Sequence, residues 1–555
     1  MHIAFLSNPA SGQVNVLFAT AQQLVDQGHL VTFLSAASCS SKIDRFRSAQ
    51  QPCHQHLIRF ISVGSGNAVR DFTAIIQTRM HLARRAPGDP VSLQTCNESS
   101  LGPADDHAAT ALSVREHLDQ VDPDMICVDA LTTALLTGVR LTKRKFILTV
   151  PCSPGLTALP GAFQPSLMAT NRRGSWGTFF ENMYLSMHDF IDSRRHPDRR
   201  AKHRLIKRLG LKSYGVSSDS SILSPHWEDD NCVASIHFNT QGLLDCPNQS
   251  PKTIFVGAGV AAEPSPSPLT PPPTTPSTPS LTPAGSFPEL VWMDEAAVLG
   301  QDVVYINMGS MFIWEPAEFR ACIEGFKAAH KKLNGRVRFL FKINSLPRTP
   351  SSTSTSEKEP AVEDLELPPF VRLTHWISNQ TAVYTHPALK AFIHHGGGNS
   401  FNEAVHFAVP QLVLSQWLDT HEYATYAHKF GLGLRSEHPP WVEAGDIEAK
   451  ILELLGARWA EFKANCRWWA YRSELGGGPE AAARIVLFHA QTQQFCAAQV
   501  GSQGRNQQSK PGSGSESKST ETETETDELT PPLSPVQVSA GFEKDAEGVK
   551  EIAIS

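Results

Sequence analysis

The stretch of residues 376–421 constrains the fold of this chain more than any other part of its sequence. An apolar run at 389–393 ends in two histidines and is followed by three glycines at 396–398, after which a helical pattern begins near Ser400. This order predicts a buried strand, a tight glycine turn and a helix start. Such a unit presents backbone N–H groups and the positive end of a helix dipole to a phosphate group.

Strand and helix patterns alternate along the rest of the chain. Residues 3–6 and 30–34 are typical of buried strands, and they flank a predicted loop at 8–15 and a predicted helix at 16–27. Further predicted strands lie at 125–128, 146–150, 302–308, 337–343 and 411–414, and further helices at 446–456, 458–473 and 479–494. Strands that alternate with helices form parallel sheets covered on both faces, which predicts the α/β class.

Low-complexity segments divide the chain. Residues 261–288 are rich in proline and cannot form helix or sheet, so we interpret them as a linker. A second insert covers about 347–364, and the acidic tail at 498–555 is expected to be disordered. The remaining residues make two units of comparable size, 1–260 and 289–497. Ligands bind open α/β sheets at the carboxyl ends of the strands, so a cleft between the units is the expected binding site.

Composition limits the classes of partner and the compartment. The chain has 555 residues and a net charge of −6, and residues 498–555 hold ten acidic against five basic side chains. The folded part is thus nearly neutral, which argues against nucleic acid as a partner. The ten cysteines include no C-x-x-C pair, as expected for reduced thiols. No apolar run reaches about 18 residues and no signal peptide is recognisable, so a cytoplasmic protein is expected.

A basic segment, residues 194–212, carries nine Lys and Arg side chains against one Asp. Two interpretations remain open. One is a solvated helix face. The other is a surface helix in peripheral contact with an anionic membrane, with its apolar side formed by Leu205, Ile206, Leu209 and Leu211.

The side chains around the glycine turn suit a nucleotide sugar. His395, Asn399 and Ser400 can donate hydrogen bonds to a diphosphate, and Gly397 leaves room for its close approach. Ser310, after another predicted strand, can add a hydroxyl from a second strand end.

Three further side chains extend this set toward a nucleoside and a sugar. Glu403 lies three residues into the predicted helix and can accept hydrogen bonds from two ribose hydroxyls. Trp376 offers a flat face to a base, and Asp419 follows the next strand, where it can accept from sugar hydroxyls.

This pattern resembles the signature of the family-1 UDP-dependent glycosyltransferases. That signature contains a Trp, a His-Pro pair, a turn of the type H-G-G-x-N-S, a Glu three residues after the Ser, a Val-Pro pair and an Asp. The matching residues here are Trp376, His386, His395, Gly397, Asn399, Ser400, Glu403, Val409, Pro410 and Asp419. Similarity extends to M-H-I-A-F-L at the start, G-H-L-V-T-F at 28–33 and the segment 291–310, and so covers most of the chain outside the low-complexity segments.

The resemblance implies the GT-B fold, in which two Rossmann-like domains face each other across a cleft, with an N-terminal acceptor domain and a C-terminal donor domain. It implies inverting transfer of a hexose, in the first place glucose from UDP-glucose, to a hydroxyl of a small hydrophobic acceptor. Because backbone N–H groups stabilise the diphosphate, no metal and no cofactor is expected. The donor residues implied are Ser310, Trp376, Gln380, His395, Gly397, Asn399, Ser400, Glu403, Asp419 and Thr420.

The first predicted loop departs from that family. Members usually carry a histidine base in a pattern like Q-G-H-x-N-P, and Gln13 occupies its place here. An amide cannot accept a proton near neutral pH, whereas a histidine with a pKa of about 6.5 can. The Asp that orients that histidine has a counterpart in Asp129.

Three interpretations of the missing base remain open. Asp129 acts as the base, directly or through a water held by Gln13. Alternatively, another side chain enters the cleft, for which His54, His56 and His81 are candidates. In the third, the chain is a regulatory protein that binds a UDP-sugar with little or no turnover.

Two smaller departures concern the donor half. The segment W-I-S-N-Q has one residue more than the family pattern before His386, which puts the position of Gln380 in question. The usual Asp-Gln pair, whose Gln contacts the sugar, is Asp419-Thr420 here, so glucose is less firmly indicated than the nucleotide.

Overall fold

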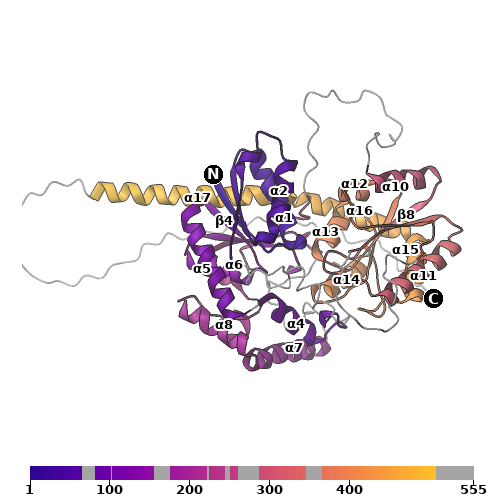
Figure 1. The fold of residues 1–555 in the computed structure, drawn as a ribbon, viewed down its shortest axis with the longest axis horizontal. Helices are drawn as coiled ribbons and strands as arrows, with labels where there is room; N and C mark the ends of the chain where they lie inside the picture. The colour runs from indigo at the N-terminus through magenta and orange to yellow at the C-terminus, as the bar shows by residue number, and fades with distance from the viewer. Residues whose placement is uncertain are drawn as a thin grey trace, which may run out of the picture. The chain divides into compact units, whose positions relative to one another are not determined.

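The structure, a computed structural model, describes residues 1–64, 82–101, 103–154, 176–221, 224–243, 250–260, 287–344 and 366–507. Two parallel β-sheets, each covered by helices, lie within one compact unit, Met1–Ala498 (Figure 1). The second unit begins at Gln499, and its described part is the end of a long helix. Parallel sheets with covering helices confirm the predicted α/β class.

Within the described residues, the first sheet has seven parallel strands in the order β3-β2-β1-β4-β5-β6-β7. They are β1 (His2–Leu6), β2 (Leu30–Ser35), β3 (Ile58–Ser62), β4 (Met125–Asp129), β5 (Phe146–Val150), β6 (Cys232–His237) and β7 (Thr253–Phe255). Its helices are α1 (Ser11–Asp26), α2 (Ser40–Ala49), α4 (Pro90–Leu101), α5 (Ala104–Val121), α6 (Thr133–Leu141), α7 (Trp176–Arg195), α8 (Pro197–Arg208) and α9 (Val216–Asp219). Strands β4 and β5 are buried along their whole length, which explains their continuous apolar sequence.

The second sheet has six described strands, also parallel, in the order β10-β9-β8-β11-β12-β13. They are β8 (Asp302–Asn307), β9 (Val337–Lys342), β10 (Val371–Thr374), β11 (Leu389–His394), β12 (Gln411–Val413) and β13 (Gly433–Arg435). Its helices are α10 (Pro288–Val298), α11 (Pro316–Lys332), α12 (Gln380–Thr385), α13 (Gly398–His406), α14 (Asp419–Lys429), α15 (Ala444–Leu455) and α16 (Trp459–Leu475).

Each sheet has one point where the direction of strand addition reverses. In the first sheet β1 lies between β2 and β4, and in the second sheet β8 lies between β9 and β11. The crevice outside the carboxyl ends of the strands at such a point is the usual ligand site of an open α/β sheet. The chain leaves β1 toward Gln13, β4 at Asp129, β8 toward Ser310 and β11 toward His395, so the predicted site residues lie at both reversal points.

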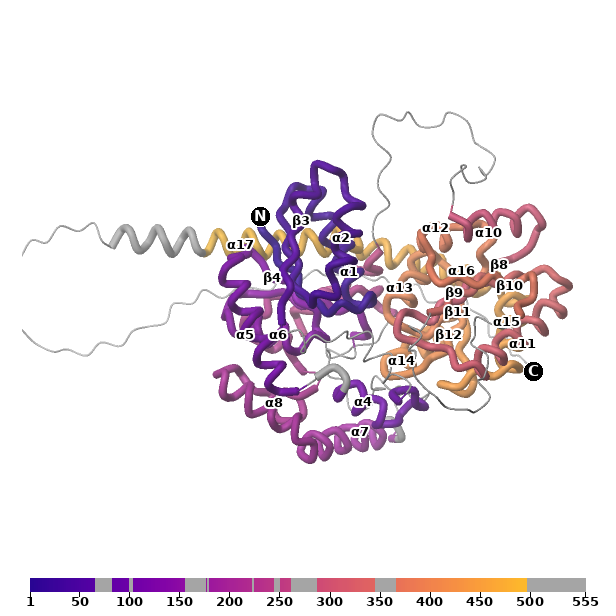
Figure 2. Tube along the Cα trace, viewed as in Figure 1, coloured from indigo at the N-terminus to yellow at the C-terminus, as the bar shows by residue number. Residues whose placement is uncertain are grey.

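The last helix, α17 (Gly478–Gln507), returns to the first sheet. Its Ala482, Ala483, Val486 and Ala490 are buried in the same apolar core as Ile3 of β1, and Figure 2 shows the helix running alongside the first half. The predicted division at 289–497 therefore does not describe the packing, because the small apolar side chains of α17 complete the core of the first sheet. The helix also continues past residue 498, where the tail was predicted to begin.

The predicted loop at 8–15 is wrong, because α1 begins at Ser11 and carries Gln13 in its first turn. The residue before the helix is Ala10, whose side chain cannot cap the free N–H groups. Sequence patterns recognise helix starts mainly by Ser, Thr, Asp or Asn at that position, so the usual signal is missing.

Most of the low-complexity sequence falls outside the described residues. This holds for 261–286 of the predicted linker, for the whole insert at 347–364 and for the tail from 508 to 555. Among the described helices, none is both long enough and apolar enough to cross a membrane.

Candidate active site

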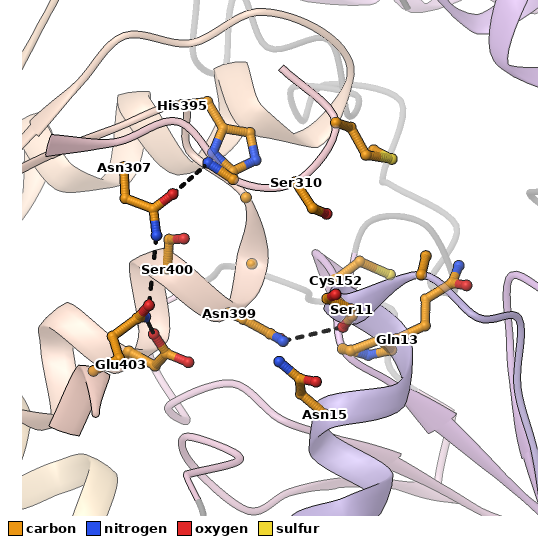
Figure 3. Close-up of a pocket in the computed structure, with 18 of the residues that line it drawn as sticks. Ser11, Gln13, Asn15, Cys152, Asn307, Ser310, His395, Asn399, Ser400 and Glu403 are labelled. Atoms are coloured by element: carbon orange, nitrogen blue, oxygen red, sulfur yellow. Dashed lines mark hydrogen bonds between the residues drawn. The ribbon is translucent and has the colours of Figure 1, made fainter. Parts of the chain in front are cut away.

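A cavity of about 670 Å³ opens at the carboxyl ends of both sheets. One wall comes from the first turn of α1, from α2 and from the segments after β4 and β5. The other comes from the segments after β8 and β11 and from α12, α13 and α14 (Figure 3). Gln13 lines the first wall. The second wall contains every donor residue implied by the sequence, namely Ser310, Trp376, Gln380, His395, Gly397, Asn399, Ser400, Glu403, Asp419 and Thr420.

The glycine turn allows three segments of backbone to approach one another closely. Gly396 has a φ of +85°, and a Cβ there would lie 2.6 Å from the carbonyl oxygen of Thr420. A Cβ on Gly398 would lie 2.4 Å from the carbonyl oxygen of Pro151, which belongs to the first half. Helix α13 begins at Gly398 without a side-chain cap. Its first N–H groups are therefore available to an anion.

His395 is held between two glycines. A Cβ on Gly309 would lie 2.5 Å from its Cε1, and a Cβ on Gly397 would lie 2.5 Å from its Nε2. Burial lowers the pKa of His395 to about 3, so the ring is neutral at neutral pH. Its Nδ1 has no hydrogen-bond partner. A neutral ring carries one N–H, which can donate to a phosphate oxygen.

Glu403, which the resemblance assigns to the ribose, lines the cavity and accepts two hydrogen bonds. Gln380 Nε2 donates to Glu403 Oε2 at 2.6 Å, and the hydroxyl of Tyr384 donates to the same oxygen at 3.2 Å. Burial raises the pKa of Glu403 to about 7. The additional residue before His386 has thus not removed Gln380 from the cavity.

Trp376 keeps 62% of its surface exposed at the cavity mouth. The guanidinium carbon of Arg45, on α2 in the first half, lies 5.4 Å from the centroid of its ring. An exposed indole face with a cation beside it can stack on a nucleobase.

Asn399 forms a hydrogen bond across the cavity that the sequence did not predict. Its Nδ2 donates to the carbonyl oxygen of Gly12 at 3.1 Å, so the starts of α1 and α13 meet there (Figure 3). Neither helix has an acidic residue in its first turn. Two positive helix ends therefore converge on one cavity, which favours an anionic ligand.

Asp419 and Thr420 have different surroundings although they are neighbours. Asp419 Oδ2 accepts from the N–H of Ser153 at 3.3 Å, and burial raises the pKa of Asp419 to about 6. The Thr420 hydroxyl accepts from the N–H groups of Gln416 and Trp417 at 2.9 Å each and donates to the carbonyl of Trp417. This hydroxyl therefore holds its own loop together and has no capacity left for a sugar.

Gln13 and Asp129 contain two buried acceptor atoms without partners, Gln13 Oε1 and Asp129 Oδ2. The other oxygen of Asp129 accepts from the N–H of Leu131 at 2.9 Å. Burial raises the pKa of Asp129 to about 7. Asp129 is fully buried at the end of β4 behind the cavity wall, while its neighbour Leu131 lines the cavity.

The histidines considered as alternative bases are not in the described cavity wall. His54 Nδ1 lies 3.4 Å from Oδ1 of Asp26, at the end of α1 opposite to Gln13. His56 is likewise not among the lining residues, and His81 falls outside the described part of the chain.

Several cavity residues were missed by the sequence analysis. Asn307 ends β8 and donates to the hydroxyl of Tyr305 at 3.0 Å, and Lys342 ends β9, where burial lowers its pKa to about 8. Lys42 on α2 donates to the Ser11 hydroxyl at 3.0 Å. Asn307 and Lys342 could have been predicted by treating every polar residue at the carboxyl end of a predicted strand as a candidate. No local sequence signal indicates that Lys42 lines the cavity. Within the described residues, no three His, Cys, Asp or Glu side chains are grouped as a metal site requires.

Buried polar contacts fix the two walls to each other. The guanidinium of Arg84 donates to Glu318 at 2.9 Å and to Gln416 at 2.8 Å. The side-chain oxygen of Asn239 accepts from the hydroxyl of Tyr423 at 2.8 Å. Since a buried charged group that loses its partner is strongly destabilising, these contacts hold the cavity in one shape.

Comparisons with known proteins agree with this geometry. Residues 355–465 match the family model described as erythromycin biosynthesis protein CIII-like, C-terminal domain. The chain is 38% identical to erythritol-mannosyl-transferase 1 of Mycosarcoma maydis across 90% of this chain and 94% of the relative. It is 28% identical to UDP-glycosyltransferase 84A4 of Arabidopsis thaliana across 33% of this chain and 37% of the relative. The solved structure of the glycotransferase of kitacinnamycin covers 88% of this chain and 99% of its own, with a TM-score of 0.56 at 16% identity.

Two α/β halves with parallel sheets and a cavity between them define the GT-B fold. The chain belongs to the family-1 UDP-glycosyltransferases, as the match along nearly its whole length with a named glycosyltransferase shows. It is accordingly a transferase. The fold and family implied by the sequence are thereby confirmed.

Proposed function

We propose that this enzyme transfers a hexose from a nucleotide sugar to one hydroxyl of a small polyol, with inversion at the sugar carbon. The observation that carries the proposal is the unpartnered acceptor Gln13 Oε1 of the first wall, which lies across the cavity from the open start of α13, together with the unpartnered Oδ2 of Asp129 behind that wall. Buried acceptors without donors are unfavourable, so a ligand that brings hydroxyl groups is favoured at this wall. An anion is favoured at the other wall. A glycosyl transfer from a nucleotide sugar brings a hydroxyl-bearing acceptor and an anionic donor together in one cavity.

In the donor half, the diphosphate is proposed to lie on the first turn of α13, where His395 and Ser400 donate to it. Trp376 stacks on the base, and Glu403 accepts from the ribose hydroxyls. UDP is the proposed nucleotide, in keeping with the family. Because N–H groups and two helix ends supply the positive potential, no metal is proposed.

Mannose replaces glucose as the proposed sugar. Two relatives with 38% identity across about nine tenths of this chain are named erythritol-mannosyl-transferases. The Thr420 hydroxyl, at the position of the glutamine that contacts the sugar in the family, is already used within its own loop. The same names favour erythritol, a four-carbon polyol, as the acceptor.

In the proposed reaction, the acceptor oxygen forms a bond to C1 of the sugar while the bond from C1 to the diphosphate oxygen breaks. The leaving nucleoside diphosphate keeps the electron pair and is stabilised by α13. The hydroxyl proton passes to Oδ2 of Asp129 through a water held by Gln13 Oε1. A carboxylate with a pKa of about 7 is well matched to accept a proton near neutral pH.

A small hydrophobic acceptor is the second candidate. It is favoured by the apolar part of the cavity wall, where Phe18, Phe46 and Met311 contribute side chains. The two acceptors would contact different parts of the cavity: a polyol would use its hydroxyls at the polar side chains, Gln13 among them, and a hydrophobic alcohol would pack against these apolar side chains.

The test is a transfer assay with the purified full chain. UDP- and GDP-linked mannose and glucose are each combined with erythritol, with other small polyols and with a panel of hydrophobic alcohols, and the released nucleoside diphosphate and the glycoside are measured. Mannosyl-erythritol formation from a mannose nucleotide supports the proposal, and use of GDP-mannose alone corrects its nucleotide. Transfer to hydrophobic alcohols only, or release of no nucleotide with any pair, contradicts it.

A further inference from the structure

Helix α7 exposes a continuous apolar face. Six of its side chains, each between 41% and 67% exposed, recur every three or four residues and therefore lie on one side of the helix. They are Trp176, Phe180, Met183, Met187, Phe190 and Ile191, here called the α7 stripe. Leu185 and Ser193, on the other side, are buried. Contiguous exposed apolar surface of this kind marks an interaction site in a soluble protein.

A basic surface continues from the α7 stripe. Arg194 follows the stripe in the same helical phase, and its guanidinium carbon lies 4.1 Å from the centroid of the Phe190 ring. Helix α8 then exposes Arg200, Arg204 and Lys207, which recur every three or four residues on its outer side. Figure 1 shows α7 and α8 following one another at the rim of the N-terminal half.

The prediction of one helix across 194–212 with its own apolar side is wrong in both respects. Pro197 begins a separate helix, because a proline is tolerated only at a helix start. Leu205 and Ile206 are buried, 8% and 3% exposed, so they pack inside the protein. The apolar component of the surface comes from α7, and α8 supplies charge.

Buried ion pairs connect α7 and α8 where the two helices meet. Arg199 is 2% exposed, and its Nη1 donates to Asp189 and to Asp192 of α7 at 2.8 Å each. These contacts hold the two helices together and occupy two acidic groups of α7. Asp198, in the first turn, is the one acid of α8; it is exposed and does not share the helical phase of Arg200 and Arg204.

We propose that the α7 stripe and the basic side of α8 together bind the surface of an anionic membrane. A helix that lies in the plane of a bilayer combines an apolar face with Lys and Arg beside it, because the apolar side chains enter the acyl boundary and the cations contact lipid phosphates. A second copy of this chain fits less well, since its basic surface would meet another basic surface in a symmetric contact. The inference is independent of the sugar and the acceptor proposed above.

The test is co-sedimentation of the full chain with vesicles of phosphatidylcholine, with and without phosphatidylserine. The wild type is expected to sediment with the anionic vesicles and to be released at high salt. One variant combines Phe180→Gln, Met187→Gln and Ile191→Gln, and a second combines Arg200→Gln, Arg204→Gln, Lys207→Gln and Arg208→Gln. Removing basic residues is expected to weaken binding by about fivefold for each residue near the lipid surface.

Each variant has a matched control on the other half. The control for the apolar variant replaces three side chains that are 62–73% exposed, in the changes Val298→Gln, Leu299→Gln and Leu475→Gln. The control for the basic variant removes the same number of positive charges, in the changes Lys327→Gln, Lys331→Gln, Lys332→Gln and Arg336→Gln. Both controls are expected to bind vesicles like the wild type, and all variants to keep the thermal unfolding midpoint. Wild-type protein that stays in the supernatant, or stripe and control variants that bind alike, would overturn the proposal. So would a dimer without lipid affinity that the stripe variant converts to a monomer.

Discussion

Replacing Asp129 by asparagine tests the proposed base through activity and stability at once. Burial raises the pKa of Asp129 to about 7 from an ordinary value of 3.8. Between those two pH values the folded protein keeps a proton that the unfolded chain has lost. Stability therefore falls as pH rises through this window, and the loss is complete above the folded pKa. A shift of about three units corresponds to about 4 kcal/mol.

The side-chain amide of the Asp129→Asn variant does not titrate, so the variant lacks this loss. The new amide N–H groups have no assured partner in a fully buried site, which costs about 1–3 kcal/mol at every pH. The stability of the variant relative to the wild type is therefore expected to rise by a few kcal/mol between about pH 4 and about pH 8. Turnover is expected to fall by about 10²–10⁴-fold, since an amide cannot accept a proton.

The measurement is urea unfolding of both proteins across this pH range, together with release of the nucleoside diphosphate. Asp44→Asn is the matched control, because the Asp44 side chain is 62% exposed and its surface pair with Arg47 contributes little. The control is expected to show neither effect. A stability difference that does not change with pH would show that the Asp129 carboxyl titrates normally. Turnover within about tenfold of the wild type would rule Asp129 out as the base.

The other predictions concern the two walls of the cavity and the metal. Gln13→His is expected to leave turnover unchanged or lower, and an increase would mean that a base is missing from the wild type. Gly398→Ala should destabilise the protein by about 1–3 kcal/mol, because the added Cβ would lie 2.4 Å from the carbonyl oxygen of Pro151. Gly445→Ala in α15 is the control and should not change stability in this way, because no atom lies within 4 Å of its added Cβ. Thermal unfolding compares the two, and equal midpoints would contradict the close approach. Turnover is expected to survive chelation by EDTA, and loss that Mg²⁺ restores would contradict the metal-free proposal.

Local sequence rules predicted which residues come together in the second wall of the cavity. His395, Asn399, Ser400 and Glu403 lie within nine residues of one another, so a single strand–turn–helix unit places all four. The eight predicted strands each coincide with a described strand, because buried parallel strands are continuous apolar runs, whereas β3, β6, β7, β10 and β13 were not predicted. The start of α1 was not predicted because no capping residue precedes it. The packing of α17 against the first sheet was not predicted because an apolar helix face has the same sequence pattern whichever sheet it covers.

By itself, the sequence determined the α/β class, the strand–turn–helix unit around the glycine turn and the residue types that this unit brings to the cavity, because these depend on neighbours along the chain. Only the tertiary structure decided which atoms are left without partners and which faces remain exposed. Asp129 has its raised pKa because segments far away in the sequence exclude water from it. The hydrogen bonds of the Thr420 hydroxyl are all made within its own loop, and Asn399 contacts the start of α1. The α7 stripe has the periodicity of a core-facing helix, and packing alone shows that it faces outward, because burial is a property of the assembled chain.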